Sequence, residues 1–219
     1  MDAQSVTVSA GAATLQGDLV LPGDPKGVVL FAHGSGSGRF SPRNRFVAQT
    51  LQRRGLATLL LDLLEEHEAD DRRKVFDIDL LADRLLGATA WLRQHPATAD
   101  LPLGYFGAST GAGAALQAAA RMPEAVAAVV SRGGRPDLAA PHLAHVAAPT
   151  LLIVGGYDGP VIEMNREALA QLTCPKELII VPGATHLFEE PGTLEQVADH
   201  AGDWFERHLT NTEIHARHT

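Results

Sequence analysis

The fold of this chain is decided by residues 103–121, which read LGYFGASTGAGAALQAAAR. An apolar run typical of a buried strand leads into a Gly-x-Ser-x-Gly pattern around Ser109, and an alanine-rich stretch of helical composition follows. A serine in such a sharp strand-to-helix turn has a strained backbone, so only small residues fit two positions to either side. Gly107 and Gly111 meet this requirement. The context predicts a reactive serine at a helix N-terminus; the alternative is a turn that needs small residues only for packing.

The composition is that of a globular protein. The chain has 219 residues, of which 45% are hydrophobic, and a net charge of −8. We expect one domain over residues 1–209 with a flexible tail at 210–219. No basic stripe suits nucleic acid, and no apolar run approaches the roughly 20 residues of a membrane span. A single cysteine, Cys174, and an N-terminus without signal-peptide features predict a cytoplasmic protein. We expect either a monomer or a homodimer.

Strand and helix signals alternate along the chain, which predicts an α/β fold with helices packed on both sides of a mostly parallel sheet. About eight strands are expected, with Ser109 after the fifth. The first two lie on either side of Gly11 and should pair as an antiparallel hairpin at the sheet edge. The other apolar runs are residues 27–32, 56–61, 103–106, 126–130, 150–154 and 177–181.

Three further helices have clear sequence signals. One has Ser41 as its N-cap and ends before Gly55, and one carries an apolar face along residues 81–92. The last begins at Thr193, with Gln196 completing a capping box. No segment between residues 130 and 150 is long enough for a separate lid, so we expect no large cap and an open site.

A serine hydroxyl is a poor nucleophile at neutral pH and needs a base, for which His186 is the best placed of ten histidines. It lies in a loop just past the last strand, where the catalytic groups of α/β sheets collect. Asp158 follows the preceding strand in a glycine-rich turn and should orient His186. The alternatives are an ordinary loop histidine, an ordinary turn aspartate, and Asp137 as the acid, which is read more simply as a helix cap.

Acyl transfer also needs donors for the oxyanion of its tetrahedral intermediate. The N–H of Thr110, directly after the serine, is one candidate. The loop 33–38, HGSGSG, follows the third strand and offers a second at Ser35, with Gly36 as an alternative donor or a substrate-binding residue. We expect His33 to fix this loop. A phosphate cradle is the competing interpretation, but the loop lacks both a Walker lysine and the spacing of a dinucleotide site.

Two features outside this set leave alternatives open. Residues 65–71, EEHEADD, are rich in oxygen ligands but precede Arg72-Arg73-Lys74, so they form either a solvated loop with internal ion pairs or a metal site. We expect the first, with no metal and no cofactor. Arg132 follows the sixth strand and either binds a substrate carboxylate or makes a structural salt bridge.

Along nearly its whole length the chain resembles the α/β-hydrolase superfamily, on the evidence of residues 33–36 and 107–111, Asp158 and His186, in that order of serine, acid and histidine. Its small size, missing cap and the residues LDLL at 61–64 resemble the dienelactone hydrolase family within it.

Dienelactone hydrolases proper use a cysteine nucleophile, whereas this chain has Ser109 and its Cys174 lies just before the last strand, where it cannot substitute. The resemblance therefore implies a serine carboxylesterase acting on a small-molecule, short-acyl ester. Dienelactone, lactone or thioester hydrolysis, acyl transfer, and a non-catalytic binding protein are the alternatives.

Overall fold

The structure, a computed structural model, describes residues 2–210. The expected tail therefore lies outside the described residues, except for Thr210. One eight-stranded sheet has the order β1-β2-β4-β3-β5-β6-β7-β8. Its strands are β1 (Gln4–Ala10), β2 (Ala13–Val20), β3 (Val28–Ala32), β4 (Ala57–Leu61), β5 (Leu103–Ala108), β6 (Ala128–Arg132), β7 (Thr150–Gly155) and β8 (Lys176–Val181). The predicted strand number is confirmed, and Ser109 follows the fifth.

The direction of the strands gathers the loops of interest at one edge of the sheet. Gly11, with a φ of 63°, turns β1 back along β2, so the predicted antiparallel hairpin is confirmed at the sheet edge. β2 pairs antiparallel with β4, and the remaining neighbours all pair in parallel. The carboxyl ends of β3 to β8 therefore face the same way, and the loops that follow them meet there.

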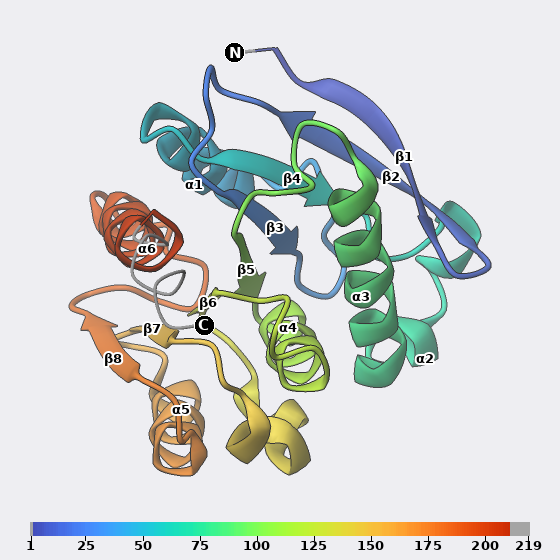
Figure 1. The fold of residues 1–219 in the computed structure, drawn as a ribbon. Coiled ribbons are helices and arrows are strands. Elements are labelled where there is room, and N and C mark those ends of the chain that lie inside the picture. Colours follow the sequence, from blue (N-terminus) through green and yellow to red (C-terminus); the bar gives the residue numbers. More distant parts are fainter. Residues whose placement is uncertain (1, 211–219) are drawn as a thin grey trace.

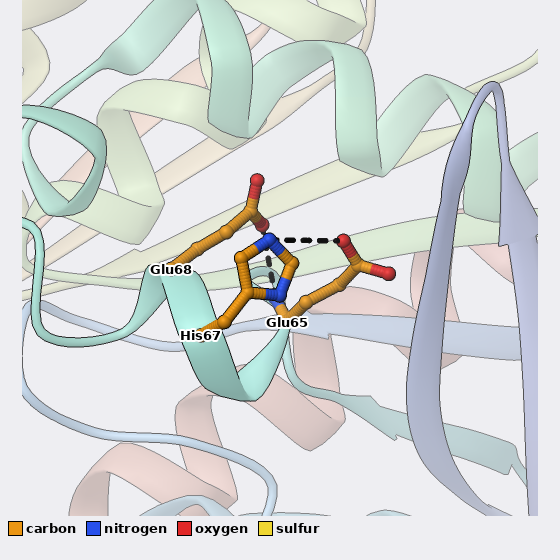
Figure 2. Close-up of side chains that lie close together, drawn as sticks. All are labelled: Glu65, His67 and Glu68. Atoms are coloured by element: carbon orange, nitrogen blue, oxygen red, sulfur yellow. Dashed lines mark hydrogen bonds and ion pairs between the residues drawn. The ribbon is translucent and has the colours of Figure 1, made fainter.

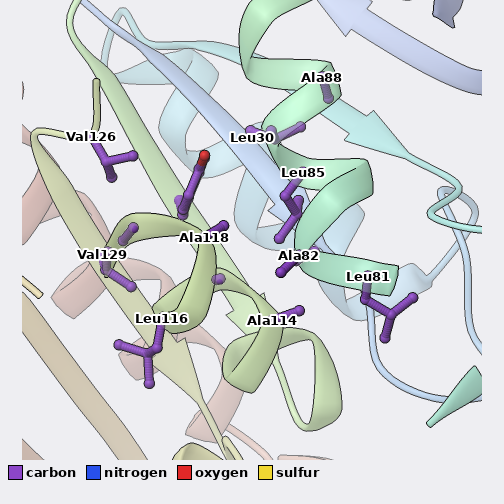
Figure 3. Close-up of a cluster of buried hydrophobic side chains, with 14 of the residues drawn as sticks. Leu30, Leu81, Ala82, Leu85, Ala88, Ala114, Leu116, Ala118, Val126 and Val129 are labelled. Atoms are coloured by element: carbon purple, nitrogen blue, oxygen red, sulfur yellow. The ribbon is translucent and has the colours of Figure 1, made fainter. Parts of the chain in front are cut away.

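Helices cover both faces of the sheet (Figure 1). On one face α3 (Ile78–Gln94) packs against α4 (Thr110–Arg121), and on the other α1 (Pro42–Arg53) packs against α6 (Thr193–Leu209). Side chains alternate along each strand, so Leu30 of β3 enters the first core and Phe31 the second. Figure 3 shows the first core, in which Leu85 of α3 and Ala118 of α4 surround Leu30.

The helix termini agree with the sequence in one case and differ in another. At α1 the Ser41 side chain accepts a hydrogen bond from the Asn44 N–H at 3.3 Å, as expected of an N-cap. The prediction of a capping box at the start of α6 is wrong. The N-cap there is Gly192, in the left-handed region, and the Thr193 hydroxyl donates to the carbonyl of Glu190 instead.

Several elements were not expected from the sequence. A helix α5 (Gly159–Gln171) joins β7 to β8, and β6 begins two residues later than the predicted run. The connection from β6 to β7 is the 3₁₀ helix η2 (Pro136–His145), which is too short to form a lid domain. A 3₁₀ helix η1 (Glu66–Glu68) and a short α2 (Arg72–Val75) lie ahead of α3. Within residues 2–210 no helix has both the length and the apolar character to cross a bilayer.

Candidate active site

Ser109 stands in a strained turn between β5 and α4. Its φ of 52° and ψ of −121° lie outside the regions that residues with a side chain normally occupy. The surrounding backbone holds it there, because its N–H donates to the carbonyl of Arg132 at 3.2 Å and its own carbonyl accepts from the N–H of Arg135 at 3.1 Å. Its side chain makes no cap hydrogen bond to α4, which leaves the hydroxyl available for chemistry.

The two glycines of the pattern are required by close contacts. A Cβ on Gly111 would collide with the carbonyl oxygens of Ala32 and His33, and one on Gly107 would collide with the Cα of Ala112. Both collisions are with backbone atoms, which cannot rotate away. Gly111 therefore allows the turn to lie against the end of β3, and Gly107 allows α4 to begin close to β5.

His186 and Asp158 are hydrogen-bonded to each other. The Nδ1 of His186 lies 2.6 Å from the Oδ2 of Asp158, on loops that follow β8 and β7. Although Asp158 occupies the N-cap position of α5, its carboxylate makes no cap bond there. Nδ1–H donation to this carboxylate leaves Nε2 of His186 as the acceptor, which is the tautomer that a general base needs.

The absence of a side chain at Gly155 also allows the loops that carry Asp158 and His186 to lie close together. A Cβ on Gly155 would meet the carbonyls of Ala184 and Thr185, and the N–H of Tyr157 donates to the carbonyl of Ala184 at 2.9 Å. The glycine-rich turn after β7 therefore lies directly on the loop that carries His186.

Ser109 and His186 line one cavity of about 240 Å³, together with Ser35, Arg132, Arg43 and other residues of the surrounding loops. Among the hydrogen bonds of residues 2–210, Asp158 is the partner of His186, and none joins His186 to Ser109. Catalytic hydrogen bonds are often long without substrate, so the shared cavity is the relevant observation.

The loop after β3 is anchored by His33. This buried ring donates from Nδ1 to the carbonyl of Gly34 at 2.8 Å and accepts at Nε2 from the Leu63 N–H at 3.0 Å. Burial lowers the pKa of His33, partly opposed by its hydrogen bond to Gly34 and the charge of Asp62, so the ring is neutral. These contacts fit the expectation that His33 fixes the loop.

Two backbone N–H groups beside Ser109 have no hydrogen-bond acceptor within residues 2–210. Thr110 is the first residue of α4, so its N–H has no acceptor within the helix. The Ser35 N–H donates no hydrogen bond among the described residues, and a Cβ on Gly34 would lie 3.2 Å from that of Ser109, which shows how closely this loop approaches. Gly36 adopts a φ of 69° in the following turn.

A second, larger cavity of about 740 Å³ begins at the same loop. It shares Gly34, Ser35 and Ser37 with the first cavity and also contains Gly36 and Thr110, but Ser109 and His186 are absent from its lining. The two cavities therefore meet at the loop that carries the Ser35 N–H, and Thr110 lines the larger one.

The acidic loop forms part of the wall of the larger cavity. Glu65, His67 and Glu68 place ligand atoms within 4.8 Å of one another (Figure 2). Glu68, however, is already paired with Lys74 at 2.9 Å and Arg84 at 3.0 Å, and its other oxygen accepts from the Glu65 N–H. With its charge balanced by two cations, Glu68 is a poor metal ligand, and the loop has the internal ion pairs expected of it.

The rival residues lie elsewhere. Asp137 is in the first turn of η2, where it pairs with Arg135 at 2.7 Å, and it is not the N-cap. Cys174 is buried just before β8, at the opposite end of that strand from His186, and burial raises the pKa of its thiol. The ring of His208 contacts that of Trp204 at an interplanar angle of 58°, with the ring centroids 4.5 Å apart. Two others of the ten histidines, His215 and His218, lie outside the described residues.

Arg132 is enclosed at the end of β6 beside the serine. Its side chain is 6% exposed, and it makes no ion pair among residues 2–210, so the structural salt bridge considered from the sequence is not formed. Arg43 lines the same cavity and was missed, because its position in the first turn of α1 gives no signal of where its side chain ends.

This sheet, with a serine turn after β5 and an Asp–His pair from the loops after β7 and β8, defines the α/β-hydrolase fold. A solved dienelactone hydrolase from Anabaena variabilis is 60% identical, with a TM-score of 0.93 over 95% of this chain and 98% of that one. The dienelactone hydrolase family model matches residues 15–211, and the chain therefore belongs to that family.

The chain also resembles a structurally similar esterase of low sequence identity and two longer proteins of high sequence identity. An esterase of Pyrococcus furiosus, 17% identical, shares the fold with a TM-score of 0.82 over 95% of this chain and 93% of its own. Proteins of two Mycobacterium tuberculosis strains, described as putative phosphoribosyl transferases, are 60% identical over 206 residues. That match covers 94% of this chain and 46% of theirs, so the chain spans about half the length of these curated relatives.

Proposed function

We propose that this chain is a serine hydrolase of the carboxylesterase type that cleaves small, short-acyl carboxylic esters. The observation that carries the proposal is the 2.6 Å bond between His186 and Asp158 beside a cavity that also holds the strained Ser109. The alternative reading of Ser109 as a packing turn leaves its strain and its cavity unexplained.

In the proposed reaction, Nε2 of His186 takes the proton of Ser109 as its oxygen attacks the ester carbonyl. Asp158 stabilises the imidazolium that forms, and the N–H groups of Ser35 and Thr110 donate to the oxyanion. His186 then gives the proton to the departing alcohol, leaving an acyl group on Ser109. Water, activated by the same histidine, releases the acid and restores the serine.

The test is turnover of p-nitrophenyl acetate by the wild type and by Ser109→Ala. We expect the variant to lose at least about 10³-fold in kcat, because removing a triad nucleophile disables the whole unit. Ser9→Ala, on the exposed edge strand, is the matched control and should keep wild-type turnover. A fluorophosphonate probe should label wild type at Ser109. Equal rates for wild type and Ser109→Ala would end the proposal, and failure to label would favour a non-catalytic binding protein.

The same three residues serve thioesters, lactones, dienelactones and transfer to an acceptor other than water. A panel that varies the acyl length, leaving group and acceptor separates these alternatives, with the short oxygen esters expected to give the highest kcat/KM. The name phosphoribosyl transferase belongs to relatives more than twice as long as the match. We propose ester chemistry for this chain because the arrangement of Ser109, His186 and Asp158 supports acyl transfer.

A further inference from the structure

Arg132 places a buried cation beside the reactive serine. It lines the smaller cavity with Ser109, and its Nε is enclosed without an acceptor. Among residues 2–210 its guanidinium has no carboxylate partner, and its charge faces the ring of Phe188, with the guanidinium carbon 5.9 Å from the ring centroid. A buried charge without a partner lowers the stability of a folded protein. This indicates that an anionic ligand binds the Arg132 guanidinium.

Arg43 brings a second cation to the same cavity. Its Nε is also enclosed without an acceptor, and its only carboxylate neighbour in the described chain is Glu189, at 3.9 Å. The Glu189 side chain is 68% exposed, so water screens that contact. Asp158 forms no ion pair with either arginine among the described residues; its hydrogen-bond partner is His186.

The charges of the two arginines act on each other. Burial, with a further contribution from the charge of Arg43, lowers the pKa of Arg132 to about 10. Arg132 therefore still carries its proton at neutral pH, and the two cations repel each other. A ligand with two negative charges removes that repulsion, whereas a single carboxylate leaves one charge unmatched.

The position of His186 tells which half of the ester enters this cavity. His186 delivers the proton to the leaving alcohol, so the alcohol portion must lie in the cavity that His186 lines. The larger cavity meets the free N–H groups without His186 and suits the acyl portion. At about 240 Å³ the smaller cavity admits only a compact alcohol, which keeps its charged group within a few atoms of the ester oxygen.

We propose that the alcohol portion of the substrate carries a phosphate monoester, bound between the guanidinium groups of Arg132 and Arg43. This inference rests on the proposed ester hydrolysis and specifies its substrate class. A planar guanidinium group donates two parallel hydrogen bonds to a pair of phosphate oxygens. Two arginines can therefore bind the tetrahedral phosphate group from two sides.

The experiment compares kcat/KM for three acetate esters of similar length, those of 3-hydroxypropyl phosphate, 4-hydroxybutanoate and 1-butanol. Wild type should prefer the phosphate to the neutral ester by at least about tenfold, since a hydrogen bond to a charged group contributes that much or more. Arg132→Gln and Arg43→Gln should each reduce the ratio of phosphate to neutral ester about tenfold. Arg45→Gln is the matched control on α1, because Arg45 reaches Asp18 outside this cavity, and it should keep the wild-type ratio.

The outcomes separate this inference from the proposed function. Hydrolysis of all three esters without a preference for phosphate, or with a preference for the carboxylate, overturns the inference and leaves the esterase standing. If no ester is cleaved and Ser109 is not labelled, the proposed function fails. Binding of inorganic phosphate to Ser109→Ala, measured by calorimetry, then still tests the site, and it should weaken at least about tenfold when Arg43→Gln is added. Equal binding with and without Arg43→Gln overturns the inference.

Discussion

Gly111 shows how a single missing side chain positions the reactive turn. The carbonyl oxygens of Ala32 and His33 occupy the space where a Cβ would be, so Gly111→Ala must push the turn away from the end of β3. We expect a loss of about 2 kcal/mol or more in the free energy of unfolding, because the collision is with backbone. Ester turnover should fall as well, since the N–H groups of Ser35 and Thr110 move apart.

Urea unfolding followed by circular dichroism measures this cost. Gly23→Ala is the control, because a Cβ there would have no other atom within 4 Å and the φ of Gly23 is not positive. Equal midpoints for the two variants would contradict the packing role of Gly111.

At the scale of residues, the positions of the candidate catalytic groups were easier to predict from the sequence than the ion pairing of the arginines beside them. Ser109, Asp158 and His186 each carry a local signal, because each follows a strand in a glycine-rich turn. Arg43 has none, since a helix start does not tell which carboxylates its side chain will meet. The unpaired state of Arg132 was equally hidden, because pairing depends on which side chains of distant segments come together.

Among the elements, η1 is fixed to the molecule by one buried carboxylate. Burial alone would raise the pKa of Glu68, but the hydrogen bonds from Lys74 and the Glu65 N–H and the charge of Arg84 outweigh it and lower the pKa to about 2 from 4.5. Because the folded pKa lies below the unfolded value, this stabilisation is fully present above about pH 4.5 and is lost as the pH falls towards 2.

We therefore expect Glu68→Gln to cost up to about 3 kcal/mol in the free energy of unfolding near neutral pH. The difference from wild type should shrink steadily as the pH falls below about 4.5. Urea titrations at a series of pH values measure it. A difference that does not change with pH would show that the carboxylate charge is not what holds η1.

There are physical reasons why two features of the secondary structure, helix α5 and the N-cap of α6, were not predicted from the sequence. Gly159-Pro160 reads as a turn, yet proline is tolerated in the first turn of a helix, and α5 begins there. Thr193 and Gln196 have the spacing of a capping box, but the left-handed Gly192 turns the chain so that Thr193 already lies inside the helix.

Across the whole molecule, Phe205 joins α6 to the middle of the sheet. Its ring is fully buried, and a Cβ on Gly104 of β5 would lie 2.6 Å from it. We expect Phe205→Ala to cost about 3–5 kcal/mol in the free energy of unfolding, since Gly104, which the ring covers, has no side chain to fill the gap. Thermal unfolding should show a Tm lower by about 10 °C.

Phe76→Ala is the control for this measurement, because the Phe76 side chain is 47% exposed and its loss leaves no cavity. Similar Tm values for both variants would contradict the role of Phe205.

The class of fold followed from alternating strand and helix signals, but the order of the strands did not. The hairpin at the edge was predictable from Gly11 and the alternation of polar and apolar residues. β4 lies between β2 and β3 in the sheet, although β3 comes before β4 in the chain. The hydrophobic runs that predict these strands do not indicate which strands will be neighbours.

The backbone of Ser109 also sets a limit on how stable this protein can be. A residue with a side chain in that conformation costs roughly 1–3 kcal/mol, which glycine avoids at an entropic cost of about 0.5–1 kcal/mol. Ser109→Gly should therefore raise the Tm by a few degrees, while Ser109→Ala, which keeps the strain, should not. If so, the most stable variant at this position is an inactive one, and natural selection has kept a less durable molecule for the sake of its chemistry.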